Sequence, residues 1–169
     1  MFSPCSNGIW RPSSNPMKKV EVKLSLPVVA PLLDVIKETA DDLRHGLAIP
    51  LQPTDLDEEF NDAWRSELIS AQNEDCRLLL SLFGSEFFAS GMIEFDEENC
   101  EGILRACSAI RLRLRELHLK ALDDELLETG NVEFDELPAP QRRAFTCYLF
   151  LATIQELIIQ HLDPSIIDS

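Results

Sequence analysis

The fold is decided by the stretch Pro140-Gln-Arg-Arg-Ala-Phe-Thr-Cys-Tyr-Leu-Phe-Leu-Ala-Thr-Ile-Gln-Glu-Leu-Ile-Ile-Gln-His-Leu162. Between residues 144 and 151 only Thr146 is plainly polar. A surface helix shows one apolar stripe, whereas a helix that is apolar almost all round is buried. The stretch therefore predicts a buried central helix, in which Gln155 and Glu156 are polar residues where the apolar run should continue.

Three further helices are predicted before this stretch, over about residues 27–46, 55–88 and 97–122, because apolar residues recur there three or four positions apart. The three apolar stripes are Val29, Leu33, Ile36, Ala40, Leu43 and Leu47; Phe60, Trp64, Leu68, Ala71, Leu78 or Leu79, and Leu82; and Cys100, Ile103, Cys107, Ile110, Leu114 and Leu117. Short connections favour antiparallel packing. We therefore expect a mainly all-α fold, an antiparallel four-helix bundle with the last helix at its centre.

A small sheet is a second expectation. Apolar and polar residues alternate over 18–26, which predicts one half-buried strand. The pattern G-x-[IV]-E-F-D-E occurs at 91–97 and again at 130–136, each time before a helix. These copies are interpreted either as short strands in a two- or three-stranded sheet, or as hydrophobic staples in which Phe95 and Phe134 precede the caps Asp96 and Asp135. Both interpretations can hold together.

The chain length bounds the domain organisation. A chain of 169 residues is typical of one domain with a sizeable core. We expect one helical domain over residues 18–163 and a tail over 164–169. Residues 1–17 are rich in Ser, Asn and Pro and are predicted to be a disordered extension, with Met17 as a second candidate for the start of the chain.

Composition narrows the function classes. Acidic residues outnumber basic ones by 30 to 15, giving a net charge of −15. Such a surface repels nucleic-acid phosphates and anionic membranes, so we expect neither as a partner. No apolar run reaches the ~18 residues of a membrane span, and the N-terminus lacks the apolar core of a signal peptide. The sequence favours a cytoplasmic protein.

Metal and cofactor sites are not expected. A di-iron site in a helical bundle needs Glu-x-x-His on two helices. The three histidines are His45, His118 and His161, and none has a glutamate three residues before it. No catalytic motif occurs either, so we expect no cofactor and no catalytic residue.

Cysteines are the candidate redox groups. The chain has five, and three of them, Cys100, Cys107 and Cys147, fall in the third and fourth predicted helices. Cys100 and Cys107 share a helix face, but two turns separate their Cα atoms by ~10 Å, too far for a disulfide. Either thiol could meet Cys147 across the core. The favoured interpretation is that they are inert, reduced core residues.

The third predicted helix is locally basic. Its basic residues are Arg105, Arg111, Arg113, Arg115 and Lys120, and Arg142 and Arg143 begin the fourth helix. These residues could bind phosphate, but pairing with the abundant Asp and Glu is the favoured interpretation. Because a buried unpaired carboxylate is costly, we also expect an ion pair between Arg111 and Glu156 inside the bundle, with Gln155 satisfying the remaining groups. The alternative is that Glu156 faces solvent.

Several stretches resemble a known family. They are Trp64-x-x-x-Leu68, Gly91-Met-Ile-Glu-Phe95, Ala109-Ile-Arg-Leu-Arg-Leu114 and Tyr148-Leu-Phe-Leu-Ala-Thr-Ile-Gln-Glu-Leu157. In order and spacing they resemble a bacterial helical family of unknown function that is often encoded beside the protease adaptor ClpS. Some actinobacterial members are known as AosR, an oxidative-stress transcriptional regulator. The resemblance implies a helical fold and a polar cluster of Arg111, Tyr148, Gln155 and Glu156.

The expected function is therefore non-enzymatic. We expect a regulatory helical protein that acts through contacts with a protein partner, a homodimer being one form of such contact. One alternative is a redox-responsive transcriptional regulator. Another is a small-ligand binder or enzyme that uses a polar site at Arg111 and Glu156.

Overall fold

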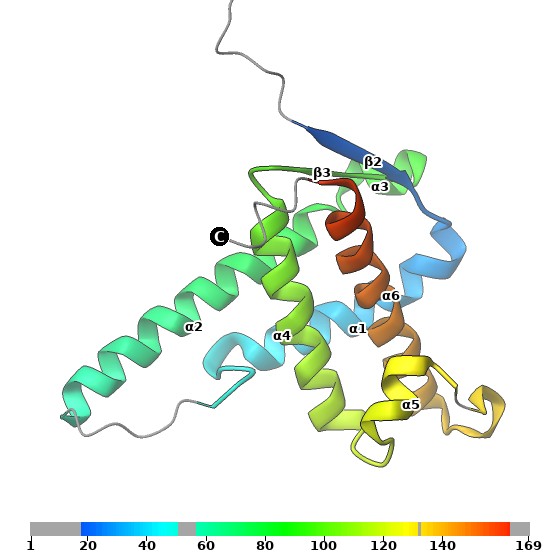
Figure 1. Cartoon of the computed structure of the whole chain (residues 1–169). Coiled ribbons are helices and arrows are strands. Elements are labelled where there is room, and N and C mark those ends of the chain that lie inside the picture. The colour runs from blue at the N-terminus through cyan, green and yellow to red at the C-terminus, as the bar shows by residue number, and fades with distance from the viewer. Residues whose placement is uncertain (1–17, 51–56, 132, 163–169) are drawn as a thin grey trace, which may run out of the picture.

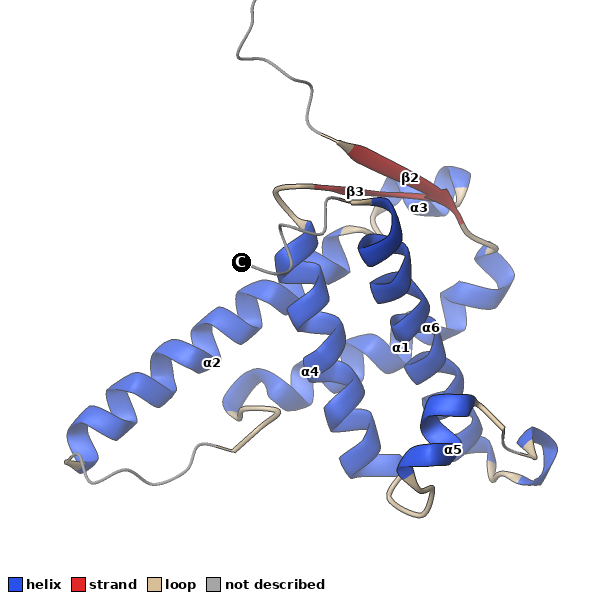
Figure 2. Cartoon of the chain, in the orientation of Figure 1, coloured by secondary structure: helices blue, strands red, loops and turns tan. Residues whose placement is uncertain are grey.

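The computed structural model describes residues 18–50, 57–131 and 133–162 (Figure 1). The predicted extension over 1–17 and the tail over 164–169 lie outside these residues. The elements in chain order are β2 (Lys19–Lys23), α1 (Leu26–Asp42), η1 (Leu43–His45), α2 (Glu58–Ser81), α3 (Ser85–Ser90), β3 (Met92–Asp96), α4 (Cys100–His118), α5 (Asp124–Thr129), η2 (Phe134–Glu136) and α6 (Ala139–His161). Figure 2 shows a mainly helical fold with a small sheet at one end, which confirms the predicted fold class.

The sheet has two antiparallel strands in the described residues. β2 pairs with β3 in a register that places Val20 opposite Phe95 and Val22 opposite Ile93. Ile93 and Phe95 are buried, so one face of this pair of strands covers the core. The predicted strand near the N-terminus is thus confirmed, and the first copy of the repeated pattern is its partner.

The second copy of the pattern is not a strand over its described residues. It ends in the 3-10 turn η2, where Phe134 is exposed. Asp135 lies inside this turn and caps no helix, so both predictions for the second copy were wrong. The physical reason is position: η2 follows α5 at the end of the molecule away from β2 and β3 (Figure 1), so neither strand of the described part of the chain lies beside it.

The central helix is α4. It packs against α1, α2 and α6, and it buries Ile103, Ala106, Cys107, Ile110 and Leu114. α6 runs antiparallel to α4 (Figure 1) and packs mainly on α4 and α1. Its opposite face leaves Leu149 36% and Ile159 50% exposed, so α6 is not enclosed all round as its composition suggested. The difference arises because α2 packs on the far side of α4.

The N-terminal half of α2 projects from the molecule (Figure 1). The helix begins where the Asp57 carboxylate accepts a hydrogen bond from the Phe60 N–H at 2.7 Å. Its C-terminal half buries Cys76 and Leu79, but Phe60 is 51% and Trp64 39% exposed. The first half of the predicted apolar stripe is therefore exposed, and its second half enters the core. We call residues 58–71 the α2 arm.

Gly91 offers a test of how the sheet joins the helices. Its φ of +77° and a Cβ position only 2.7 Å from the Leu24 carbonyl oxygen leave no room for a side chain. Gly130 has a similar φ of +69° but nothing within 4 Å of its Cβ position. We expect Gly91→Ala to lower the free energy of unfolding by about 3 kcal/mol and Gly130→Ala by about 1 kcal/mol, measured by urea denaturation. Equal losses would contradict the tight approach.

Candidate functional site

Arg111 forms a polar tie between α4 and α6. Its Nη1 donates a hydrogen bond to Gln155 Oε1 at 2.7 Å, and its guanidinium carbon lies 4.3 Å from the centroid of the Tyr148 ring. Gln155 Nε2 in turn donates to the Leu104 carbonyl oxygen at 3.0 Å and to Ser108 Oγ at 2.8 Å. A cation over an aromatic face adds electrostatic attraction to the stacking. The amide and the guanidinium together join the two helices.

The predicted ion pair between Arg111 and Glu156 was wrong. Glu156 is exposed on α6 and its Oε1 accepts a hydrogen bond from Gln160 Nε2 at 3.2 Å. Among the described ion pairs, none joins Arg111 to a carboxylate. Successive residues of a helix point about 100° apart, so only one member of the Gln155-Glu156 pair can face α4. The neutral amide does, which leaves the carboxylate in water and removes its desolvation cost.

The other basic residues in and just after α4 are largely paired within the chain. Arg105 Nε lies 2.8 Å from Asp75 Oδ2, Arg113 Nε lies 3.0 Å from Asp42 Oδ2, and Lys120 Nζ lies 2.9 Å from Glu116 Oε1. Arg115 pairs with Asp124. The favoured interpretation of this basic stretch, intramolecular pairing, is confirmed for these four residues.

The four described cysteines are buried free thiols. Burial raises the pKa of Cys147 to about 12. Burial also raises the pKa of Cys107 to about 12, against the opposing effect of the Arg111 charge, and that of Cys76 to about 11. Burial raises the pKa of Cys100 as well. Since the thiolate is the reactive form, these groups are poorly suited to redox sensing.

An open apolar groove lies between α2 and α4. It encloses about 630 Å³. Residues 47–50 form its floor, and the helices on either side form its walls. The lining residues are Leu47, Ala48, Ile49, Pro50, Leu68, Ala71, Gln72, Asp75, Leu104, Arg105, Ser108, Ala109 and Leu112. We call this the α2–α4 groove. Phe60 and Trp64 continue the stripe of Leu68 and Ala71 along the α2 arm at helical spacing.

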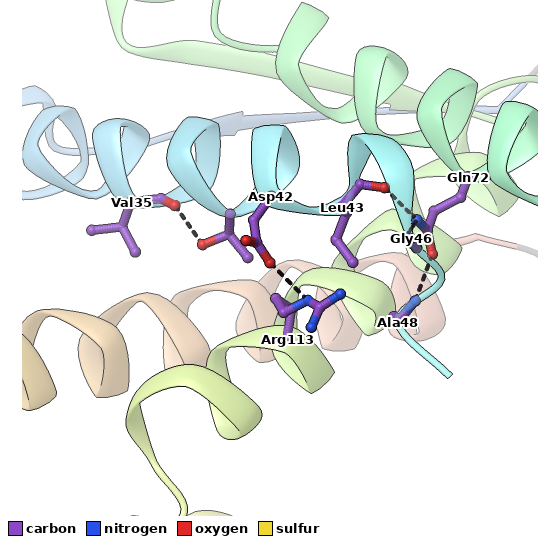
Figure 3. Close-up of polar contacts among 8 residues, drawn as sticks. Val35, Asp42, Leu43, Gly46, Ala48, Gln72 and Arg113 are labelled. Carbon is purple, nitrogen blue, oxygen red and sulfur yellow. Dashed lines mark hydrogen bonds and ion pairs between the residues drawn. The ribbon is translucent and has the colours of Figure 1, made fainter. Parts of the chain in front are cut away.

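Gln72 fixes the floor of the groove to α2 (Figure 3). Its Nε2 donates to the carbonyl oxygens of Leu43 at 3.1 Å and Gly46 at 2.9 Å, while its Oε1 accepts from the Ala48 N–H at 3.0 Å. The carbonyls at the end of a helix have no partner within the helix. One side chain therefore satisfies the end of the first helical segment and the turn that follows it. The groove is held in shape before anything binds.

At their crossing, α2 and α4 are very close. A Cβ on Gly102 would lie 3.2 Å from Asp75 Oδ1 and 3.2 Å from Leu78 Cδ1. The bidentate contact of Arg105 with Asp75 closes the same end, at 2.8 Å and 3.0 Å. Away from this crossing the two helices diverge (Figure 1), and the groove occupies the space between them.

Periodicity predicted the apolar stripe of α2, which includes the groove residues Leu68 and Ala71. The spacing of these residues does not separate a helix face that enters the core from one that stays exposed. α1 buries adjacent pairs such as Leu32 with Leu33 and Val35 with Ile36, whereas the adjacent apolar pairs of the α2 arm, Ala63 with Trp64 and Leu68 with Ile69, are exposed or half-buried.

Comparison with protein-family models, with curated proteins and with solved structures finds no match. No group of three or more His, Cys, Asp or Glu side chains within the described residues is placed to hold a metal ion. None of the helices in the described part of the chain is long and apolar enough to cross a membrane. The resemblance to the helical family encoded beside ClpS therefore stays a prediction.

The polar tie makes a clear prediction about stability. Gln155→Ala leaves Arg111 and Ser108 without their partner, so we expect a loss of about 2 kcal/mol in the free energy of unfolding. Glu156→Ala removes an exposed carboxylate on the same helix and should change it by less than about 0.5 kcal/mol. Urea denaturation of both variants measures the difference. A larger loss for Glu156→Ala than for Gln155→Ala would refute the tie.

The thiols are expected to resist alkylation in the native protein. A thiol with a pKa near 12 is only about one part in ten thousand thiolate at about pH 8, and burial blocks the reagent. A Cys5→Ser variant restricts the measurement to the four described thiols. Iodoacetamide followed by mass spectrometry should label none of them until denaturant is added, while an added Ser66→Cys thiol on the exposed side of α2 reacts at once. Rapid labelling of Cys107 or Cys147 would contradict their inert role.

Proposed function

We propose that the chain is a non-enzymatic protein-interaction module that binds a partner through the α2–α4 groove. The observation that carries this proposal is the uncovered apolar surface of the groove and the α2 arm. Ile49 is 67%, Phe60 51% and Trp64 39% exposed, and all three adjoin the groove or continue its stripe. Single exposed apolar residues are ordinary, but a contiguous apolar surface marks an interaction site.

The shape of the groove supports this function. Its volume of about 630 Å³ is spread along two helices and open to solvent, rather than closed around a small molecule. Open apolar grooves between helices are a common docking surface for an amphipathic helix of a partner. The Gln72 hydrogen bonds hold the floor rigid, which lowers the entropy lost on binding.

The absence of reactive chemistry at the groove favours binding over catalysis. Its polar lining residues are few, and Arg105 is engaged by Asp75 and Gln72 by backbone groups. A module of this kind can regulate a partner protein by binding it and releasing it. The alternative of a thiol-based regulator is less well supported, because burial raises the pKa of all four described thiols.

Site-specific photocrosslinking tests the proposed contact surface. A photoreactive amino acid is placed at Ala71 in the groove, and at Glu156 on the exposed face of α6 as a matched control. Irradiation in the cells that make the protein should give one discrete crosslinked protein from Ala71 and none from Glu156. Adding Leu68→Glu, which puts a charge in the groove, should abolish the product. Equal capture from both positions, or none from Ala71, would refute the proposal.

A further inference from the structure

We infer that the occupant of the α2–α4 groove is the α2 arm of a second copy of the chain. This inference rests on the proposed function and deepens it by naming the partner. Each arm lies in the groove of the other copy, so that one contact fills two grooves. The inference follows from the order of large and small side chains along the apolar stripe and from the symmetry that this order permits.

The side chains of the stripe change in size along α2. Its N-terminal end carries the aromatic residues Phe60 and Trp64, which are exposed on the arm. Its other end enters the groove, whose lining includes the short side chains of Ala48, Ala71, Ser108 and Ala109. Packed helices interlock when a large side chain of one fits between smaller ones of the other. One chain therefore carries both the large side chains and the hollow that such a contact needs.

An antiparallel pair of arms brings these two ends together. Phe60 and Ala71 lie about 17 Å apart along the helix. When two arms are related by a two-fold axis near residue 66, Phe60 of each copy meets Ala71 of the other. Trp64 then meets Leu68, because both pairs have this midpoint to within one residue. A two-fold dimer repeats each contact twice from one self-complementary patch, which is why it is the commonest homo-oligomer.

The groove gives the incoming helix a second wall. α2 and α4 diverge from their crossing, so the second arm packs on both, with Leu104 and Leu112 on the α4 side. Phe60 and Trp64 together present roughly 200 Å² of exposed surface. With Ile49 and the groove walls, the contact buries on the order of 500 Å² per copy, which reaches the lower limit of a specific interface. The area therefore fits a reversible dimer.

The charges of the arm permit this contact. Successive residues of a helix point about 100° apart, which places Glu58, Glu59 and Asp62 on the face away from the stripe. Asp62 accordingly lines a separate pocket beside η1. Glu67 borders the stripe, and a two-fold axis brings the same flank of both helices together, so it lies near Glu67 of the other copy. The dimer is an apolar contact between like charges, and salt strengthens it by screening them.

Sedimentation velocity over a concentration series tests the inference. The chain carries Cys5→Ser, so that this thiol cannot join two copies. We expect a monomer–dimer equilibrium with a Kd on the order of 10 μM. Raising salt from about 50 to about 500 mM should tighten the dimer at least about threefold, and Glu67→Gln should tighten it about threefold at the lower salt. A contact made by opposite charges would weaken with salt instead.

Matched variants assign the contact to the arm. Phe60→Glu on the arm and Ile159→Glu on α6 each replace an apolar side chain that is about half exposed, at 51% and 50%. Neither side chain is buried, so both variants should fold, which circular dichroism checks. Phe60→Glu should weaken the dimer at least about tenfold because it puts a charge into the contact, while Ile159→Glu should change it less than about twofold.

A short bismaleimide tests the orientation of the two arms. Glu67→Cys places a thiol near the two-fold axis on each copy. Ser66→Cys, one residue earlier, places it on the face that lines the pocket beside η1. The four described native thiols are buried, so the added thiol is the accessible one. We expect covalent dimers from Glu67→Cys and few from Ser66→Cys.

The outcomes separate this inference from the proposed function. A chain that stays monomeric far above the expected Kd, or a dimer that salt weakens, overturns the second copy as the occupant. So does a dimer lost on Ile159→Glu rather than Phe60→Glu, or equal crosslinking from residues 66 and 67. If photocrosslinking from Ala71 then captures a different protein, the groove remains the contact surface and only the partner is wrong. If a monomeric chain captures nothing from Ala71, both proposals fall.

Discussion

The shape of this molecule depends on one amide. Gln72 of α2 binds two carbonyl oxygens and one N–H at the end of the first helical segment. A helix end leaves carbonyls that need partners, and here the partner comes from a different helix. The contact fixes where α2 stands relative to α1 and where the chain turns at residues 46–50. Those turn residues then form the floor of the α2–α4 groove. The same Gln72 contact therefore pairs the free carbonyls of the helix end and positions part of the candidate binding surface.

The second constraint is the close crossing of α2 and α4. Gly102 allows the close approach because it has no side chain, and the ion pair between Arg105 and Asp75 joins the two helices on the solvent side of the crossing. Beyond the crossing the helices separate, and α4 turns its other faces to α1 and α6. In the α2 arm, Phe60 stays 51% and Trp64 39% exposed. Helices usually gain most of their stability from packing such a face, so an uncovered stripe is a cost that a binding partner would offset.

Much of the fold could be predicted from the sequence, because the spacing of apolar residues within a helix or strand depends only on neighbouring residues. The four long helices and the strand at 19–23 follow from the spacing of apolar residues and from helix-breaking residues, but the helix predicted over 55–88 ends at Ser81 and the separate short helix α3 follows it. It was harder to predict which polar residue of α6 faces inward, because Gln155 and Glu156 are adjacent and a small rotation of the helix would turn one or the other toward α4. Periodicity could not predict whether Phe60 and Trp64 are buried or exposed. The spacing of an apolar stripe is the same whether the helix that it packs on belongs to this chain or to another protein. The second copy of the repeated pattern failed for a related reason: a strand needs an edge, and only the tertiary arrangement supplies one.

The most direct test of the central claim is a map of backbone amide chemical shifts in the isotope-labelled chain during titration with a synthetic amphipathic helical peptide. We expect the shifts that change to concentrate in the α2 arm, in residues 47–50 and on α4 from Leu104 to Leu112, with β2, β3 and α6 largely unaffected. Shifts centred instead on the exposed side of α6 around Leu149 and Ile159, or no shifts at all, would contradict the assignment of the α2–α4 groove as the binding surface.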